Sequence, residues 1–340
     1  MDIAKGIGIL IIVYGHSWFV ATSLDLMYPI LASFVLPLFF FLSGVFFKPE
    51  QPFVEMAVRK ADGLLKPFFF TMLLYVIVRD VLRGQPLLPD IGGVLYASVD
   101  TIPWQALWFL PHSWVAILFS WLMLRLIQRL KLPLVAACML IGVQLLLGIW
   151  TLQWFWQIPV SVGDHTWTLP GLPFSLDVTL ISSTYFIYGY LLRDWLRRHE
   201  GSLLTLLISV VLFAAVFIYS HDTMDLAQRR YDHWLWTSLL AVIGVYICWA
   251  LARVLMVSAL LTRVMTYIGQ STLILLIFHG EIQHKTFDLM ERLGLHPFMA
   301  ACVGLVVALL VPLLIGEVIK RVAFLRFFYF PFPVRKAPKP

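Results

Sequence analysis

Long apolar segments alternate with short polar ones along almost the whole chain. A helix needs about 20 apolar residues to cross the hydrocarbon core of a bilayer, where its backbone must satisfy its own hydrogen bonds. By this measure the pattern predicts ten membrane-spanning helices. They lie at about 3–22, 28–47, 66–83, 107–128, 133–150, 176–195, 202–220, 235–256, 267–285 and 297–320. Charged and histidine side chains interrupt the third and the ninth of these segments.

The composition excludes a soluble globular domain. Of the 340 residues, 61% are hydrophobic, 15% are aromatic and 13% are charged, and the mean hydropathy is +0.87. Soluble domains carry about 25% charged residues, so this chain has too few polar side chains to cover a core in water. No internal repeat or linker divides it. We therefore expect one all-α membrane domain over 1–330 and a disordered basic tail over 331–340.

Lys and Arg are distributed unevenly between the segments that join the predicted helices. With the N-terminus in the cytoplasm, 19 of the 25 basic residues fall on the cytoplasmic side and six on the outer side. The outer six are Arg79, Arg83, Arg229, Arg230, Lys285 and Arg292. Cytoplasmic loops are enriched in Lys and Arg, so this bias predicts that both termini are cytoplasmic. The formal charge of +6 then reflects contact with anionic membrane lipid and does not indicate nucleic-acid binding.

The three cysteines, Cys138, Cys248 and Cys302, are scattered through apolar segments. They lack the close paired spacing that is typical of metal sites, and an odd, scattered set does not suggest a disulfide framework. We therefore expect no disulfide and no bound metal.

The longest predicted outer loop, about 151–175, contains Trp154, Trp156 and Trp167 but no Lys or Arg. Tryptophan commonly anchors membrane proteins at the lipid–water interface, and it also stacks on sugar rings. The interfacial role is the more common one and is favoured here, while sugar binding stays open.

The first predicted helix carries two ionisable side chains on one face. Lys5 and His16 are 11 residues apart, which is three helical turns plus a small angle, and the rise between them is about 16 Å. Lys5 is expected at the cytoplasmic rim and His16 near the middle of the membrane. An ionisable group at that depth usually faces a cavity or a functional pathway, and imidazole exchanges a proton near neutral pH. A general base is therefore favoured over a buried, packing histidine.

A small, polar break, Ser43-Gly44, follows an aromatic stretch near the cytoplasmic end of the second predicted helix. It would either open the backbone to a ligand or serve helix packing, and the sequence does not separate these two. The next cytoplasmic loop is expected to carry Arg59, Lys60 and Lys66. Three cations this close together favour binding of the phosphates of an anionic cofactor. The general enrichment of cytoplasmic loops in basic residues, which anchors the protein in the membrane, explains them equally well.

Trp108 and His279 are further candidates for substrate contact. Trp108 stands where the fourth predicted helix begins, and His279 lies within the ninth. His279 is a second buried imidazole candidate, although a histidine near the outer interface is a slightly more common explanation than catalysis.

Four motifs bring these positions together. They are Asp2-x-x-Lys5-Gly6-Ile7, Gly15-His16-Ser17, the stretch from Pro37 to Ser43-Gly44, and Leu107-Trp108-Phe109-Leu110, with weaker echoes at Tyr188-Gly189-Tyr190 and Ile268-Gly269-Gln270-Ser271. In these motifs the chain resembles the acyltransferase 3 family of membrane O-acyltransferases, particularly its fucose 4-O-acetylase-like branch.

The resemblance implies a ten-helix domain in the plasma (bacterial inner) membrane. It also implies that acetyl-CoA, or another acyl-CoA, is the cytoplasmic donor, and that a hydroxyl of a surface glycan or its lipid-linked precursor is the acceptor. By position, His16 becomes the catalytic base and Lys5 the cation that accompanies it. Ser43 and Gly44 would line the acyl-donor site, and Arg59 and Lys60 would contact the donor phosphates. Where the family has a further basic residue this chain has Gly63, and Lys66 would substitute for it.

The implied chemistry is coherent. A sugar hydroxyl is a weak nucleophile, so its attack on a thioester requires removal of its proton, and the tetrahedral intermediate requires hydrogen-bond donors for its oxyanion. The sequence offers Ser43 or a loosened backbone N–H as that donor. The alternative is a ten-helix transporter that uses Lys5, His16 and His279 to relay protons or bind an anion. Such transporters usually contain an internal repeat, and nothing in 171–340 mirrors the Lys5–His16 spacing.

Overall fold

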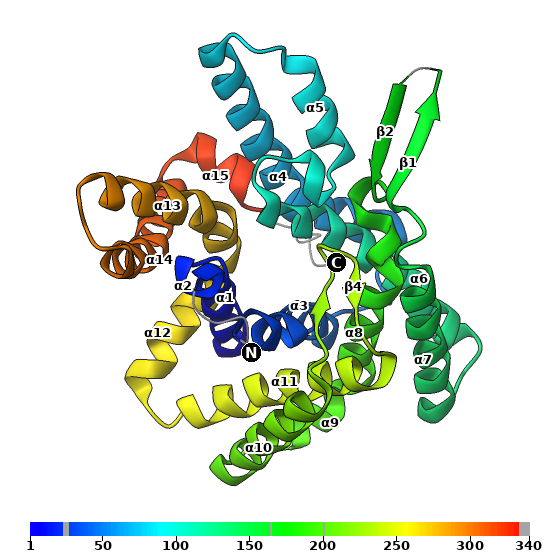
Figure 1. Ribbon diagram of the computed structural model, residues 1–340. Coiled ribbons are helices and arrows are strands. Elements are labelled where there is room, and N and C mark those ends of the chain that lie inside the picture. The colour runs from blue at the N-terminus through cyan, green and yellow to red at the C-terminus, as the bar shows by residue number, and fades with distance from the viewer. Residues whose placement is uncertain (23–26, 164, 200, 333–340) are drawn as a thin grey trace, which may run out of the picture.

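A computed structural model describes residues 1–22, 27–163, 165–199 and 201–332, and most of them are helical (Figure 1). The α-helices are α1 (Asp2–Gly15), α2 (Trp18–Thr22), α3 (Met27–Val45), α4 (Phe53–Arg83), α5 (Leu87–Tyr96), α6 (Phe109–Arg129), α7 (Leu134–Thr151), α8 (Thr179–Leu191), α9 (Arg193–Arg198), α10 (Leu203–Ser220), α11 (Trp234–Leu255), α12 (Ala259–Gln270), α13 (Thr272–Arg292), α14 (Pro297–Arg321) and α15 (Ala323–Tyr329). Short 3₁₀ helices are η1 (Val99–Thr101), η2 (Gln105–Trp108) and η3 (Pro173–Val178), and the strands are β1 (Trp156–Val162), β2 (His165–Pro170), β3 (Met224–Asp225) and β4 (Arg230–Tyr231).

An all-α membrane fold fits this structure, but ten spanning helices are not confirmed. Among the described residues, six helices are long and apolar enough to cross a membrane, namely α4, η2 with α6, α7, α10, α11 and α14. The number becomes seven if α12 and α13 count as one bent span. The remaining predicted spans contain helices that are shorter or broken, such as α8 with 13 residues. The predicted tail lies almost wholly outside the described residues, which end at 332.

Two predicted spans are interrupted at polar or small residues. The first stops at Gly15 and resumes at Trp18, so that His16 and Ser17 lie in the break. The ninth breaks at Ser271, where α12 and α13 meet with a bend of 77°. Backbone irregularity inside a membrane protein is tolerated where protein or a cavity surrounds it, so both breaks point to the interior of the bundle.

Helix α4 and the outer loop also differ from the prediction. Helix α4 begins at Phe53, so Arg59 and Lys60 lie on a helix and not in a loop. The predicted loop 151–175 contains an antiparallel hairpin, β1–β2, in which Pro159 pairs with Thr168. The start of α4 was not predicted because its first turns are polar. The hairpin was not predicted because paired strands outside the membrane need no long apolar run.

Helices α1 and α3 lie side by side, with α12 and α13 packed against α1 and with α8 and α11 packed against α3 (Figure 1). Glycines allow two of these approaches. A Cβ at Gly6 or at Gly269 would overlap the backbone of the facing helix at the α1–α12 contact. The same holds for Gly44 and Gly189 at the α3–α8 contact, where the facing backbone atoms belong to Phe186 and Phe41. Small residues at such crossings let membrane helices come close together.

Replacing Gly44 by alanine is expected to destabilise the protein by about 1–3 kcal/mol, because the added Cβ would force α3 and α8 apart. Thermal unfolding followed by size-exclusion chromatography in detergent measures the effect. Gly280→Ala on α13 is the matched control, since a Cβ there meets no atom within 4 Å. Equal melting temperatures for the two variants would show that the α3–α8 contact does not require glycine.

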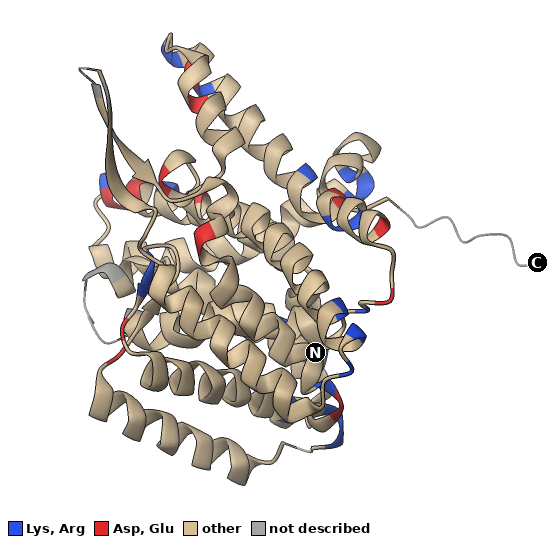
Figure 2. Cartoon of the chain, turned by 90° about the vertical axis from the view of Figure 1, so that its right-hand side faces the viewer, with Lys and Arg blue, Asp and Glu red and all other residues tan. Residues whose placement is uncertain are grey.

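Lys and Arg gather around the end of the bundle that carries the N-terminus (Figure 2). Lys5 lies there with its ammonium group 5.9 Å from the centre of the Phe46 ring at the end of α3. We call this end, which holds Lys5, Ser43 and Lys60, the basic end. His16 lies at the far end of α1, so the length of that helix separates His16 from the basic end.

Candidate active site

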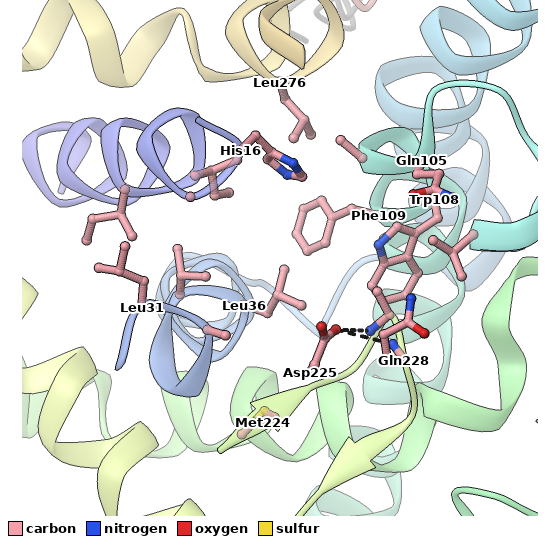
Figure 3. Close-up of a pocket in the computed structure, with 18 residues that line it drawn as sticks. His16, Leu31, Leu36, Gln105, Trp108, Phe109, Met224, Asp225, Gln228 and Leu276 are labelled. Atoms are coloured by element: carbon pink, nitrogen blue, oxygen red, sulfur yellow. Dashed lines mark hydrogen bonds between the residues drawn. The ribbon is translucent and has the colours of Figure 1, made fainter. Parts of the chain in front are cut away.

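A cavity of about 210 Å³ lies at the far end of α1, between α1, α3, η2, the start of α6, and the β3–β4 hairpin (Figure 3). Its polar lining groups come from His16, Gln105, Trp108, Asp225 and Gln228. The rest of the lining is mostly aliphatic, with Phe109 and Met224 added. The cavity is therefore a small, largely apolar chamber with a few convergent polar groups, which is the usual character of a small-molecule site.

His16 lies in the break between α1 and α2. Its backbone N–H still donates to Ile12 O at 3.1 Å, and Ser17 N–H donates to Tyr14 O at 2.9 Å, so α1 ends in a tight last turn. The break turns the His16 side chain out of the helix stack and into the cavity, where the side chain is exposed (Figure 3). His16, which the sequence predicts as a general base, thus lines this cavity, and its chemical role stays a prediction.

His279 lies directly behind His16, with the ring centres 5.1 Å apart and the rings tilted by 59°. It is fully buried on α13 and does not line the cavity. Its Nδ1 is 2.8 Å from Leu275 O and 3.1 Å from Leu276 O. Carbonyl oxygens only accept, so Nδ1 carries the hydrogen and Nε2 holds a lone pair. Nε2 has no hydrogen-bond partner among the described residues.

The β3–β4 hairpin covers one side of the cavity. Asp225 Oδ1 accepts hydrogen bonds from the backbone N–H groups of Ala227, at 3.0 Å, and Gln228, at 3.2 Å. These bonds hold the turn in place, with Asp225 on the opposite side of the cavity from His16 (Figure 3). Asp225 and Gln228 were not predicted, because nothing in their local sequence indicates that they lie opposite a residue more than 200 positions away.

Asp232 closes the base of this hairpin. Its Oδ2 accepts from the Thr223 N–H and from the Thr223 hydroxyl, both at 2.8 Å, and its Oδ1 accepts from Arg230 Nε at 2.8 Å. Burial acts to raise the pKa of Asp232, but the hydrogen bonds from Arg230 and Thr223 outweigh it, so the pKa lies below its usual value. The carboxylate is thus ionised and ties the two strands together at neutral pH.

A buried ion pair anchors the same hairpin to the rest of the bundle. Arg229 and Asp177 have fully buried side chains, and Arg229 Nε lies 2.7 Å from Asp177 Oδ2. Arg229 also donates to Ser175 Oγ at 3.1 Å, and its guanidinium lies 4.2 Å from the centre of the Trp156 ring. A buried charge must be paired and hydrogen-bonded, and here η3 and β1 supply the partners. The sequence predicts Arg229 only as an outer-loop cation.

His112 is a third histidine near the cavity; it is fully buried, and it was not predicted as a site residue. Its ring stacks on Trp108 with the centres 5.2 Å apart, and its Nε2 is 2.9 Å from Ser182 Oγ. It thereby fixes Trp108 in the cavity wall and joins α6 to α8. In the sequence, His112 follows Trp108 by four residues, a spacing that puts both on the same helix face. This spacing is common in packed cores, so it does not by itself indicate a functional site.

Lys5 does not line the cavity. Its ammonium group is 3.5 Å from Asp2 Oδ1, and about a third of the side chain, 34%, is exposed. Ser43 is also exposed at the basic end, where its hydroxyl donates to Phe39 O at 2.8 Å. Gly44 is buried against α8, which favours the packing role that the sequence left open. In this structure, Lys5 therefore makes no contact with the space in which a substrate would react at His16.

The three cations predicted to bind donor phosphates have different surroundings. Arg59 donates to Gln51 Oε1 at 2.5 Å, and it adjoins Lys60 on the first turns of α4. Lys66 lies 2.6 Å from Asp62 Oδ1 and donates to Phe330 O at 2.9 Å. Lys66 thus fastens α4 to the segment after α15, a role inside the protein that was not predicted. Arg59 and Lys60 lie at the basic end, and their proposed contact with donor phosphates stays a prediction.

The profile of the acyltransferase domain that defines acyltransferase family 3 matches residues 1–317, almost the whole chain. The chain belongs to the acyltransferase 3 family. No curated protein and no solved structure matches it. The family makes this chain a membrane acyltransferase. Membership of the fucose 4-O-acetylase-like branch remains a prediction.

Proposed function

We propose that this acyltransferase 3 protein moves an acetyl group from cytoplasmic acetyl-CoA to a hydroxyl of a cell-surface glycan or its lipid-linked precursor, with His16 as the general base. The observation that carries the proposal is the placement of His16 at a helix break, facing a small cavity with polar groups converging on it. The transporter alternative receives no support from the family.

The proposed reaction is a direct acyl transfer. The acceptor hydroxyl oxygen attacks the thioester carbonyl carbon while the imidazole of His16 takes the hydroxyl proton. A tetrahedral intermediate forms, the C–S bond breaks, and the CoA thiolate leaves and takes the proton back from the imidazolium. Asp225 lines the same cavity, and its negative charge would favour the imidazolium while it exists.

The oxyanion of the intermediate needs a donor inside the cavity. Ser43 was predicted for this role but lies at the basic end, where its hydroxyl already donates to Phe39 O. The side-chain amides of Gln105 and Gln228 and the indole of Trp108 line the cavity and are the donors that fit. A chamber of about 210 Å³ also suits a short acyl chain such as acetyl.

The donor is proposed to enter at the basic end. Its phosphates would contact Arg59 and Lys60, with Lys5 beside them, and its flexible arm would run along α1 toward His16. The rise over the 11 residues from Lys5 to His16, about 16 Å, sets the length that the arm must span.

Replacing Arg59 and Lys60 together by glutamine is expected to raise the KM for acetyl-CoA about tenfold or more and to leave kcat nearly unchanged, because the two cations act in binding and not at the reacting atoms. Initial rates of CoA release at varied acetyl-CoA measure this. Arg125→Gln/Arg129→Gln on α6 is the matched control for loss of two basic charges. An unchanged KM in the Arg59/Lys60 variant would leave these residues as topology anchors only.

A further inference from the structure

A second hollow, of about 460 Å³, lies between α4, α13 and α15 on the other side of η2 from the cavity. The α4 side is lined by Thr71, Leu74, Tyr75, Val78, Arg79, Leu82 and Arg83. The facing side is lined by Trp104 just before η2, by Phe278 and Lys285 of α13, and by Tyr329 of α15. The α4 residues recur every three or four positions, so they form one stripe that rises about 18 Å along the helix. We call this hollow the α4–α13 groove.

The groove is apolar along its length and basic at one end. Leu74, Val78 and Leu82 are exposed on α4, a helix long and apolar enough to cross a membrane, so this side of the groove suits contact with hydrocarbon. Tyr75, Trp104, Phe278 and Tyr329 form its inner wall, with successive ring centres 5.0, 6.3 and 5.8 Å apart. Such a surface fits a hydrocarbon chain.

Three cations, Arg79, Arg83 and Lys285, lie at the rim of the groove. All three are among the basic residues that the sequence predicts on the outer side of the membrane. Arg79 is paired with Asp80, at 2.7 Å, and with Asp90. Lys285 is 3.7 Å from Glu281 and has 70% of its side chain exposed. Arg83 is exposed and has no ion-pair partner within the described part of the chain. Arg83 and Lys285 can therefore accept an anionic group without breaking a buried pair.

The groove and the cavity share one thin wall. Trp104 lines the groove, and the next residue, Gln105, lines the cavity. On α13, Phe278 faces the groove and Leu276 faces the cavity. The indole Nε1 of Trp104 is buried and has no hydrogen-bond partner among the described residues. A molecule seated in the groove would thus lie beside the site at His16, with Trp104 and Phe278 in the wall between them.

We propose that the α4–α13 groove binds the lipid that carries the acceptor sugar, with its phosphate at Arg83 and Lys285 and its hydrocarbon chain along α4. The proposal rests on the proposed function, since it names how the acceptor is presented. Two complementary features select this occupant over a free sugar or a free anion: a long apolar stripe for a chain and a cationic rim for a phosphate.

The test uses the full chain in nanodiscs of phosphatidylcholine, with decaprenyl phosphate as the probe and native mass spectrometry as the measurement of Kd. Arg83→Gln/Lys285→Gln is expected to raise the Kd for this probe at least tenfold. Val78→Trp, which fills the apolar part of the groove, is expected to raise it similarly. Arg292→Gln, on α13 but outside the groove, is the matched control and should leave the Kd unchanged.

Competing ligands separate the possible sources of binding. Decaprenol, which lacks the phosphate, is expected to bind at least tenfold more weakly than decaprenyl phosphate, and inorganic phosphate should not displace the probe. Equal binding of decaprenol, no effect of the groove variants, or displacement by an equal concentration of phosphatidylglycerol would each overturn the proposal. Binding needs no turnover, so it can be measured in His16→Ala protein. Failure of acyl transfer with intact probe binding would count against the proposed function alone.

Discussion

Replacing His16 by alanine is expected to lower kcat for acyl transfer by at least about 100-fold while the protein inserts and folds normally. A positioned general base contributes about 10²–10⁴ in rate, and among the described residues no other imidazole lines the cavity to replace it. Folding should survive because the His16 side chain is exposed to the cavity and makes no hydrogen bond to the described residues.

Transfer of labelled acetyl from acetyl-CoA into a membrane lipid extract measures this effect. His199→Ala is the matched control, because His199 is an exposed histidine at the end of α9 and lies away from the cavity. Elution of both variants at the wild-type position in size-exclusion chromatography shows that they are folded. Full activity of His16→Ala would exclude the general-base role.

Replacing Arg229 by methionine is expected to destabilise the protein by about 3–5 kcal/mol. The change leaves the Asp177 carboxylate buried without a counter-charge, and removal of one partner from a buried pair carries that cost. It also removes the hydrogen bond to Ser175 and the contact with Trp156, so the β3–β4 hairpin loses its anchor. If the hairpin then moves away from the bundle, the cavity opens on the side of Asp225 and Gln228.

The neighbouring residue supplies the control. Arg230 is 57% exposed in its side chain and pairs with Asp232, so Arg230→Met should cost no more than about 1 kcal/mol. Thermal unfolding of both variants in the same detergent gives the comparison. The double variant Arg229→Met/Asp177→Leu also removes the unpaired carboxylate. It is therefore expected to unfold at a higher temperature than Arg229→Met alone. Equal stability of Arg229→Met and Arg230→Met would show that the buried pair does not anchor the hairpin.

Much of the bundle could be predicted from apolar segments alone. Every predicted span contains a helix, because the period and length of apolar runs are local properties. The number of spanning helices could not be predicted in the same way. Gly15-His16-Ser17 breaks one helix and Ser271 breaks another, and both breaks depend on the groups that surround them in the folded bundle.

The candidate site was predicted in part. His16 and Trp108 were predicted separately and now line one cavity, and His279 lies directly behind His16. Asp225 and Gln228 escaped prediction because a two-residue strand pair in a polar loop gives no periodic signal. Arg229 escaped it because a sequence shows the charge of an arginine but not its burial, and the partner, Asp177, is 52 residues away.

The central claim is that this protein transfers an acyl group from a CoA thioester, and the most direct test is the wild-type protein itself. Purified full-length chain in nanodiscs, supplied with labelled acetyl-CoA and a lipid extract from the membranes that produced it, is expected to release CoA and to place label in the lipid fraction. Folded protein that neither binds nor turns over any acyl-CoA tested would contradict the account.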